Sequence, residues 1–252
     1  MSDDLFLDSF RKLLAGLGAD PWPELEASGF LDVLRPEAEG GAGLDLSGLF
    51  PLAFECGRQA APLALLQTLL ARIADPAARN CADAAPVLVA GGVDPDAARA
   101  LCAAADAAMM AGAIDALQAM TLDHASTRRQ FGREISKFQA IQHQIAVMAG
   151  EVMAARMAAE TALVGAPLSI SAPAAAVAKM RCGEAAQACS GIAHAVHGAI
   201  GVSAEHALHR FTGALHRLRL SHGGESYWAR RLGEWALARP DDASTLARSL
   251  QG

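Results

Sequence analysis

The chain has 252 residues, of which 52% are hydrophobic and 19% are charged, and its formal net charge is −6. This composition is typical of a folded, helix-rich protein and excludes an intrinsically disordered chain. The acidic balance argues against nucleic acid as a partner, because binding to phosphates requires concentrated basic surface.

The first part of the chain is predicted to be helical, with irregular interruptions. The expected helices lie near residues 3–17, 24–28 and 46–73. The glycine-rich segment 36–45 is predicted to be a loop, and Pro51 and Pro62 are predicted to interrupt the third helix. Residues 86–90, PVLVA, are followed by two glycines and predict a short strand.

The second part is predicted to contain longer helices, because apolar residues recur every three to four positions. The expected helices lie near residues 97–130, 137–164, 172–196, 204–218 and 224–238. Helices of this length with short connections pack most easily as an antiparallel bundle. We therefore expect an N-terminal helical domain (1–74), a linker (75–96) and a C-terminal helical bundle (97–252).

The junction at residues 128–146 reads RRQFGREISKFQAIQHQIA and carries the strongest functional signal. Gly132 can adopt the left-handed backbone that closes a helix. Arg128 is then expected in the last helical turn, where its guanidinium is free to bind an anion. Gln139 and Gln142 add amide groups at the start of the next helix. This set of side chains suits a phosphate-rich ligand.

Three segments of the chain resemble the flavin-dependent acyl-CoA dehydrogenases, in the order in which that family has them. The run RRQFG followed by FQAIQHQIA resembles a helix junction in the family's C-terminal helical domain. Residues 22–75, with the phrase FECGRQAAPLALLQTLLA, resemble its N-terminal helical domain. Residues 176–220 resemble its last two helices and the glycine turn between them.

The resemblance implies a mostly α fold, with an N-terminal helical domain and a C-terminal antiparallel bundle. In the family, a β-barrel-like middle domain separates the two and packs against the flavin ring. Here residues 75–96 stand in its place, and roughly twenty residues are too few for a barrel. The middle domain is therefore expected to be a remnant.

The resemblance also implies FAD as the cofactor, held across a subunit interface. Arg128 and Phe131 match family residues that meet the pyrophosphate and adenine end of the flavin, and Gln139 matches a glutamine of the same contact set. The turn Gly198-Ala199-Ile200-Gly201 matches a glycine turn that approaches the dinucleotide from the neighbouring protomer. Glycine suits this turn because a backbone without Cβ can come close to phosphate oxygens.

The family's catalytic base has two possible positions in this chain. In most members, a glutamate at the start of the last helix removes the α-proton of the acyl thioester. His222 falls on that position and Glu225 lies one turn further on, so both are candidate catalytic residues. Other members place the base on the helix before the Arg-Phe-Gly junction. That position falls near Cys102, with Asp106 as the closest carboxylate.

The histidines and cysteines do not predict a metal centre. His194 with His197, and His206 with His209, have the spacing of metal-ligand pairs, but helical periodicity alone often produces such pairs. No carboxylate or cysteine completes either set, so we expect no metal. The five cysteines are scattered, without a CxxC pair, which is typical of reduced thiols in a cytoplasmic protein.

The segment before His222 is basic and has two interpretations. Its cationic side chains are Arg210, His216, Arg217 and Arg219. They could form a patch that faces CoA or another phosphate. Alternatively, they form a solvated or subunit-facing side of a helix, with Glu205 as an ionic partner.

Together with the resemblance, these features imply an FAD-dependent oxidoreductase of lipid metabolism that oxidises an acyl-CoA thioester between Cα and Cβ. The expected partners are a second copy or a full-length acyl-CoA dehydrogenase, and an electron-transfer protein. The alternative is a catalytically silent member that completes a partner's flavin site and stabilises the oligomer. The N-terminus lacks a signal segment and no apolar run of about 18 residues is evident, so we expect a cytoplasmic protein without a membrane span.

Overall fold

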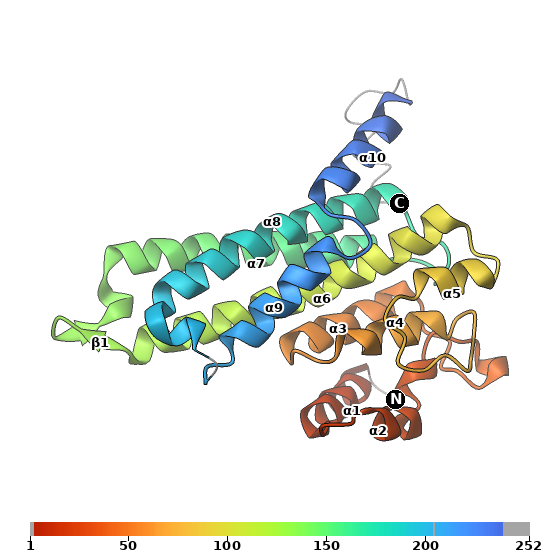
Figure 1. Ribbon diagram of the computed structural model, residues 1–252, viewed down its shortest axis with the longest axis horizontal. Helices are drawn as coiled ribbons and strands as arrows, with labels where there is room; N and C mark the ends of the chain where they lie inside the picture. Colours follow the sequence, from red (N-terminus) through yellow and green to blue (C-terminus); the bar gives the residue numbers. More distant parts are fainter. Residues whose placement is uncertain (1–2, 204, 239–252) are drawn as a thin grey trace.

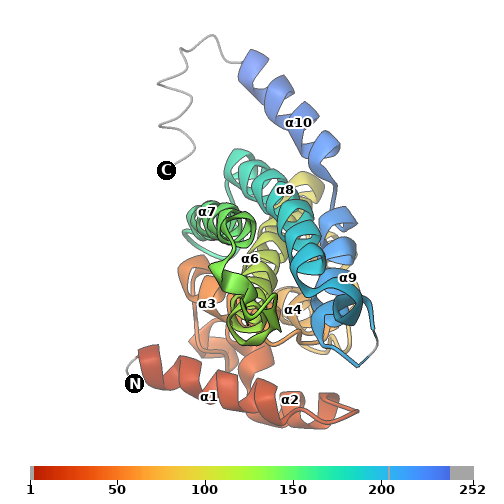
Figure 2. The same cartoon turned by 90° about the vertical axis from the view of Figure 1, so that its left-hand side faces the viewer.

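The computed structural model describes residues 3–203 and 205–238, and its regular structure is almost entirely helical (Figure 1). The N-terminal helices are α1 (Asp3–Gly16), α2 (Trp22–Ser28), α3 (Leu46–Arg58) and α4 (Leu63–Ala71), with the 3-10 turns η1 (Phe30–Asp32) and η2 (Glu37–Glu39) between α2 and α3. Helices α1 and α2 lie under the rest of the molecule (Figure 2). Helix α3 continues through Pro51, so the predicted interruption at this residue is wrong.

The second part of the chain forms the helical bundle. Its helices are α6 (Pro95–Thr127), α7 (Gln139–Ala162), α8 (Ala172–His197), α9 (Leu208–Leu220) and α10 (Glu225–Leu237). Seen end-on, α6 lies in the middle of the molecule, between α3, α7, α8 and α9 (Figure 2). Asp94 caps the start of α6 by accepting hydrogen bonds from the backbone N–H groups of Asp96 and Ala97. The mostly α fold and the bundle are confirmed.

Helix α6 is the core of the protein. By length and composition it could cross a membrane, contrary to the prediction of no such apolar run, but 94% of its most apolar stretch is buried inside the protein. That burial is typical of a core helix. Two glycines allow the close crossing of α3 and α6, because a Cβ at Gly57 or Gly112 would overlap a backbone carbonyl of the facing helix.

The segment between α4 and α6 holds the main correction to the predicted elements. Residues 86–90 form most of a short helix, α5 (Ala85–Ala90), and not a strand. Pro86 lies in its first turn, where the missing N–H costs no hydrogen bond, and Leu88 is buried in the core. Because the described chain between α4 and α6 contains no strand, the reduction of the middle β domain is confirmed.

Candidate functional site

A buried carboxylate on α6 organises the polar centre of the protein. Asp106 is 1% exposed and accepts hydrogen bonds from three side chains. Its Oδ2 atom lies 2.5 Å from Ser221 Oγ and 2.7 Å from His222 Nδ1. Its Oδ1 atom lies 3.2 Å from the Nε2 atom of Gln67 on α4. Asp106 is the carboxylate nearest to one of the family's two base positions, and it therefore contacts His222, which falls on the other.

A buried lysine compensates this carboxylate. Lys179 on α8 is 1% exposed, and its Nζ atom lies 3.7 Å from Asp106 Oδ2. The same ammonium donates a hydrogen bond to the backbone carbonyl of Leu218, near the end of α9. Burial lowers the pKa of Lys179, and the charge of Asp106 opposes that change. Lys179 carries no local sequence signal of this role, because a lysine on a predicted helix is usually solvated.

His222 lies in the turn between α9 and α10 with carboxylates on both sides. Its Nδ1 atom faces Asp106, and its Nε2 atom lies 3.1 Å from Asp83 Oδ1. Burial lowers the pKa of His222, but the hydrogen bonds and charges of Asp106 and Asp83 outweigh it and raise the pKa above the usual value. The backbone of His222 is left-handed, with φ +53°, which is uncommon for a residue other than glycine.

An open cleft of about 650 Å³ borders this histidine. Asp83, Pro86, Val89, Arg99, Ser221 and His222 are among its lining residues. The cleft has apolar walls and convergent polar groups, which is the usual character of a small-molecule site. His222 is therefore placed at the edge of a space that can hold a substrate.

Glu225, the other candidate base, points elsewhere. Its carboxylate forms an ion pair with Arg219 and packs against the backbone of α8 at Gly183, where a Cβ would overlap it. Glu225 is not among the residues that line the cleft beside His222. The structure thus brings His222, but not Glu225, to the cleft.

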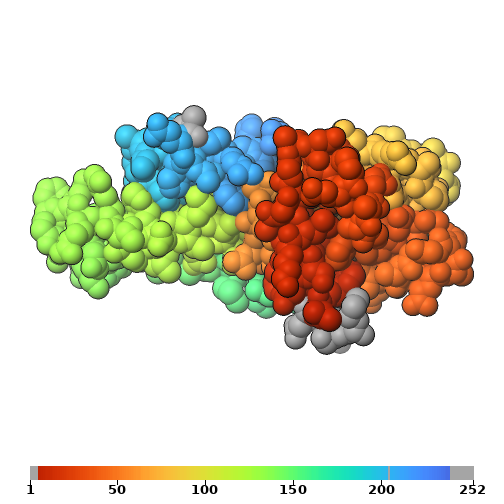
Figure 3. Space-filling view, turned by 90° about the horizontal axis from the view of Figure 1, so that it is seen from below, coloured from red at the N-terminus to blue at the C-terminus, as the bar shows by residue number. Residues whose placement is uncertain are grey.

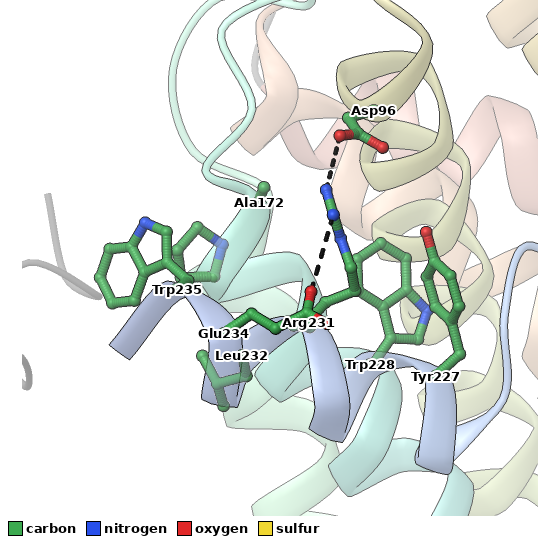
Figure 4. Close-up of a pocket in the computed structure, with 10 residues that line it drawn as sticks. Asp96, Ala172, Tyr227, Trp228, Arg231, Leu232, Glu234 and Trp235 are labelled. Carbon is green, nitrogen blue, oxygen red and sulfur yellow. Dashed lines mark hydrogen bonds and ion pairs between the residues drawn. The ribbon is translucent and has the colours of Figure 1, made fainter. Parts of the chain in front are cut away.

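A second, smaller cavity of about 290 Å³ lies where α10 meets the starts of α6 and α8 (Figure 4). Arg231 spans it, with 2.5 Å between its Nη2 atom and Asp96 Oδ2. The rings of Trp228 and Trp235 also line it. The ion pair ties α10 to α6, and neither candidate base lines this cavity.

Two of the predicted flavin contacts, Arg128 and Phe131, lie at a β-hairpin at the far end of α6 (Figure 1). Strands β1 (Arg129–Gln130) and β2 (Arg133–Glu134) are joined by Phe131 and Gly132, with φ values of +51° and +80°. Two left-handed residues are typical of a type I′ hairpin turn. Gly132 therefore does not close a helix: α6 ends at Thr127, and the prediction that Arg128 lies in its last turn is wrong.

The hairpin and the glycine turn leave their candidate ligand groups uncovered. Arg128 and Gln139 are exposed, and Phe131 is 90% exposed at the hairpin tip. The turn at 198–201 belongs to a 3-10 helix, η4 (Gly198–Val202), in which Gly198 and Ala199 are exposed and Gly201 is buried. Gly198 has φ +62° and ψ −140°, a conformation that favours glycine.

These two elements lie at the same end of the bundle. A small apolar cluster of Ala125, Ile135 and Val196 connects the end of α6, the 3-10 turn η3 (Ile135–Lys137) and the end of α8. Along α6, Arg128 follows Asp106 by 22 residues, which corresponds to about 33 Å of helix. The predicted cofactor contacts of one subunit are therefore far from its own His222.

Three histidine rings contact one another near the glycine turn: His124 stacks on His197, and His206 meets His197 edge-on. His124 and His197 have ring centroids 4.4 Å apart, and His197 and His206 are 4.8 Å apart. Burial is the main cause that lowers the pKa of His124 and of His197, and at His197 the hydrogen bond with the Ala193 carbonyl opposes it. Within residues 3–203 and 205–238, no group of histidine, cysteine or acidic side chains has the arrangement of a metal site.

Comparisons with known proteins agree with this fold. The sequence model described as "Acyl-CoA dehydrogenase, C-terminal domain" matches residues 96–237. The chain belongs to the acyl-CoA dehydrogenase family. A curated relative, the 3-sulfinopropanoyl-CoA desulfinase of Paraburkholderia xenovorans (strain LB400), is 38% identical over 91 residues, which are 36% of this chain and 24% of the relative. The match thus spans about a quarter of that protein.

Solved structures show the same architecture. The "Tcur3481-Tcur3483 steroid ACAD G363A variant" has a TM-score of 0.76 and 22% identity, covering 94% of this chain and 99% of that one. The "ChsE4-ChsE5 complex from Mycobacterium tuberculosis" has a TM-score of 0.77 and 17% identity, covering 96% and 99%. At these identities the likeness establishes the fold alone.

Proposed function

We propose that this chain is an FAD-dependent, acyl-CoA dehydrogenase-like oxidoreductase that oxidises a CoA thioester between Cα and Cβ within an oligomer. Family membership supports the reaction class. The single observation that carries the proposal is the hydrogen-bonded pair of Asp106 and His222 at the edge of the cleft. Removal of an α-proton requires a positioned base, and a histidine held by a carboxylate is suited to that task.

His222, Asp106 and Lys179 have separate roles in the proposed proton transfer. Asp106 accepts the Nδ1–H of His222, so Nε2 is the nitrogen that takes the α-proton once the substrate displaces the exposed Asp83 side chain from it. The imidazolium that forms is stabilised by Asp106, and Asp83, which lies 3.1 Å from Nε2, can pair with the Nε2–H after the product leaves. The ammonium of Lys179, 3.7 Å from Asp106 Oδ2, offsets the negative charge of this carboxylate inside the core. When bound, the flavin supplies the acceptor for the hydride that leaves Cβ.

The hairpin and the glycine turn fit the pyrophosphate and adenine end of a flavin. Arg128 offers an exposed guanidinium, Phe131 offers an uncovered ring, and the backbone at Gly198 is open to close approach. Because this end lies about 33 Å from Asp106 along α6, Arg128 and Phe131 are proposed to contact a flavin in a neighbouring subunit. The neighbour is a second copy or a full-length relative, and an electron-transfer protein accepts the electrons.

The same separation favours a second candidate function. In this alternative, the chain is catalytically silent and lends its hairpin and glycine turn to the flavin site of a partner. Two of the similar solved structures carry the names of two components each, Tcur3481-Tcur3483 and ChsE4-ChsE5. Such pairing supports a division of roles between two chains, with the middle domain supplied by the other chain.

The absorbance spectrum of the protein purified alone separates these functions. Bound flavin that is bleached by an acyl-CoA supports an enzyme that acts as a homo-oligomer. A colourless protein that gains flavin only with a full-length relative supports the silent subunit or a heteromeric enzyme. A protein that binds no flavin in either case contradicts the proposal.

Two substitutions then identify the base. His222→Ala is expected to lower kcat of an active preparation about 100-fold or more, because general base catalysis contributes at least that much. Glu225→Gln serves as the comparison, since Glu225 pairs with Arg219 away from the cleft. A large loss with Glu225→Gln and none with His222→Ala would contradict the assignment of His222.

A further inference from the structure

A groove between the N-terminal helices and α9 is distinct from the cleft at His222. It has a volume of about 510 Å³. Its apolar lining includes Leu14, Leu17, Ala61 and Leu63. In Figure 3, the blue segment that contains α9 lies beside the red N-terminal helices on one face of the molecule. The groove therefore brings residues from opposite ends of the chain together.

The charged side chains of this groove are all basic. Arg210 and Arg217 on α9 line it, together with His209. No carboxylate is among its lining residues, although the whole chain has a net charge of −6. A carboxylate-free basic groove on an acidic protein focuses positive potential on one site.

The two arginines are not used by the fold. Neither guanidinium makes an ion pair, a hydrogen bond or a ring contact with the part of the chain that the structure describes, and both residues are exposed. Arg219, two residues after Arg217, pairs with Glu225. Glu205, the expected partner of this basic segment, forms no ion pair with any described residue. The prediction that Glu205 compensates this group is not supported.

The spacing of the arginines limits the ligand. Arg210 and Arg217 are seven residues apart on α9, which is about 10 Å and nearly two helical turns, so both point to the same side. Two long side chains at this separation can converge on one extended anion from either end. The planar guanidinium binds phosphate oxygens in pairs. The apolar lining can then cover a nonpolar body attached to the anion.

We propose that this groove binds the diphosphate group of a small ligand through Arg210 and Arg217. The shared chemistry is that of inorganic diphosphate, a nucleoside diphosphate and coenzyme A. The site does not depend on the flavin or on His222, so its test is separate from the test of the proposed function.

Calorimetric titration of the full chain with inorganic diphosphate, ADP and coenzyme A tests this site. At least one probe is expected to bind, and added salt is expected to weaken its binding. Arg210→Ala/Arg217→Ala is expected to raise Kd about tenfold or more, because hydrogen bonds to charged groups are lost. Equal affinity for all three probes identifies the diphosphate as the recognised group. Tighter binding of ADP or coenzyme A shows that the apolar lining contributes.

Two further variants make the test specific. Arg230→Ala removes an exposed arginine of α10 that lies outside the groove, and it is expected to leave Kd unchanged. Arg210→Lys/Arg217→Lys retains the charge but loses paired hydrogen bonding, and is expected to give an intermediate Kd. The proposal is overturned if no probe binds, or if Arg230→Ala weakens binding as much as the double alanine variant does.

Discussion

Asp106→Asn is the most informative single change, because it removes a charge from the buried centre and preserves the shape of the side chain. The ammonium of Lys179 lies 3.7 Å from this carboxylate, and both side chains are 1% exposed. Removing one partner of a buried ion pair leaves an uncompensated charge and costs about 3–5 kcal/mol. Because burial lowers the pKa of Lys179, loss of its proton can relieve part of this cost, which places the expected value toward the lower end of this range.

The expected change is large enough for thermal unfolding followed by circular dichroism. For a protein of this size, each kcal/mol shifts Tm by about 2–4 °C, so Asp106→Asn is expected to lower Tm by about 6–20 °C. Lys179→Met is expected to destabilise the protein as well, because it leaves the carboxylate uncompensated. The double variant Asp106→Asn/Lys179→Met is expected to lose less free energy of unfolding than the two single variants lose together, since neither charge is then left without its partner.

A control on the same helix shows how much stability is lost when a carboxylate charge is removed from a partly exposed ion pair. Asp115 of α6 forms an ion pair of 3.1 Å with Arg58, and both side chains are partly exposed. Asp115→Asn is therefore expected to cost only about 0–1 kcal/mol. The reasoning is refuted if Asp106→Asn costs no more than Asp115→Asn and if the two changes at Asp106 and Lys179 are additive.

Three other changes test separate parts of the structure. Arg128→Ala is expected to weaken flavin retention by the flavin-loaded oligomer, since a charge-assisted phosphate contact is lost. Lys137→Ala is the control. An unchanged flavin content in Arg128→Ala would place the cofactor elsewhere. The raised pKa of His222 means that its contribution to the free energy of unfolding is present below about pH 6.5 and is lost as pH rises through the folded-state pKa. Urea denaturation at several pH values should show this loss of stability in the wild type. An equal loss in His222→Gln would assign the effect to another group. Gly57→Ala is expected to lower the free energy of unfolding in urea by about 1–3 kcal/mol or more, because its Cβ overlaps α6. The control Gly150→Ala, in open space on α7, should raise it by up to about 1 kcal/mol. Similar effects of both changes would contradict the close crossing of α3 and α6.

The local pattern of the chain predicted the helices well and the short connections poorly. The long helices α6, α7 and α8 were predicted because their composition and periodicity are local properties. The run PVLVA at 86–90 favours a strand by composition, but the described chain has no neighbouring strand to pair with it, and burial of Leu88 favours the helix. The left-handed backbone of Gly132 was also predicted, although it closes a hairpin instead of a helix. The division into domains and the cytoplasmic location stay predictions.

The sequence by itself determined the family, the order of the helices, the reduced middle domain and the candidate residues at each position. Helical periodicity, glycine positions and short motifs are properties of neighbouring residues, so they can be recognised without the tertiary structure. Only the tertiary structure decided that Asp106 and Lys179 face His222, that Glu225 points away, and that α9 forms a basic groove with the N-terminal helices. His222 lies 116 residues after Asp106. Contacts between residues so far apart depend on how the helices pack, and local sequence does not specify that packing.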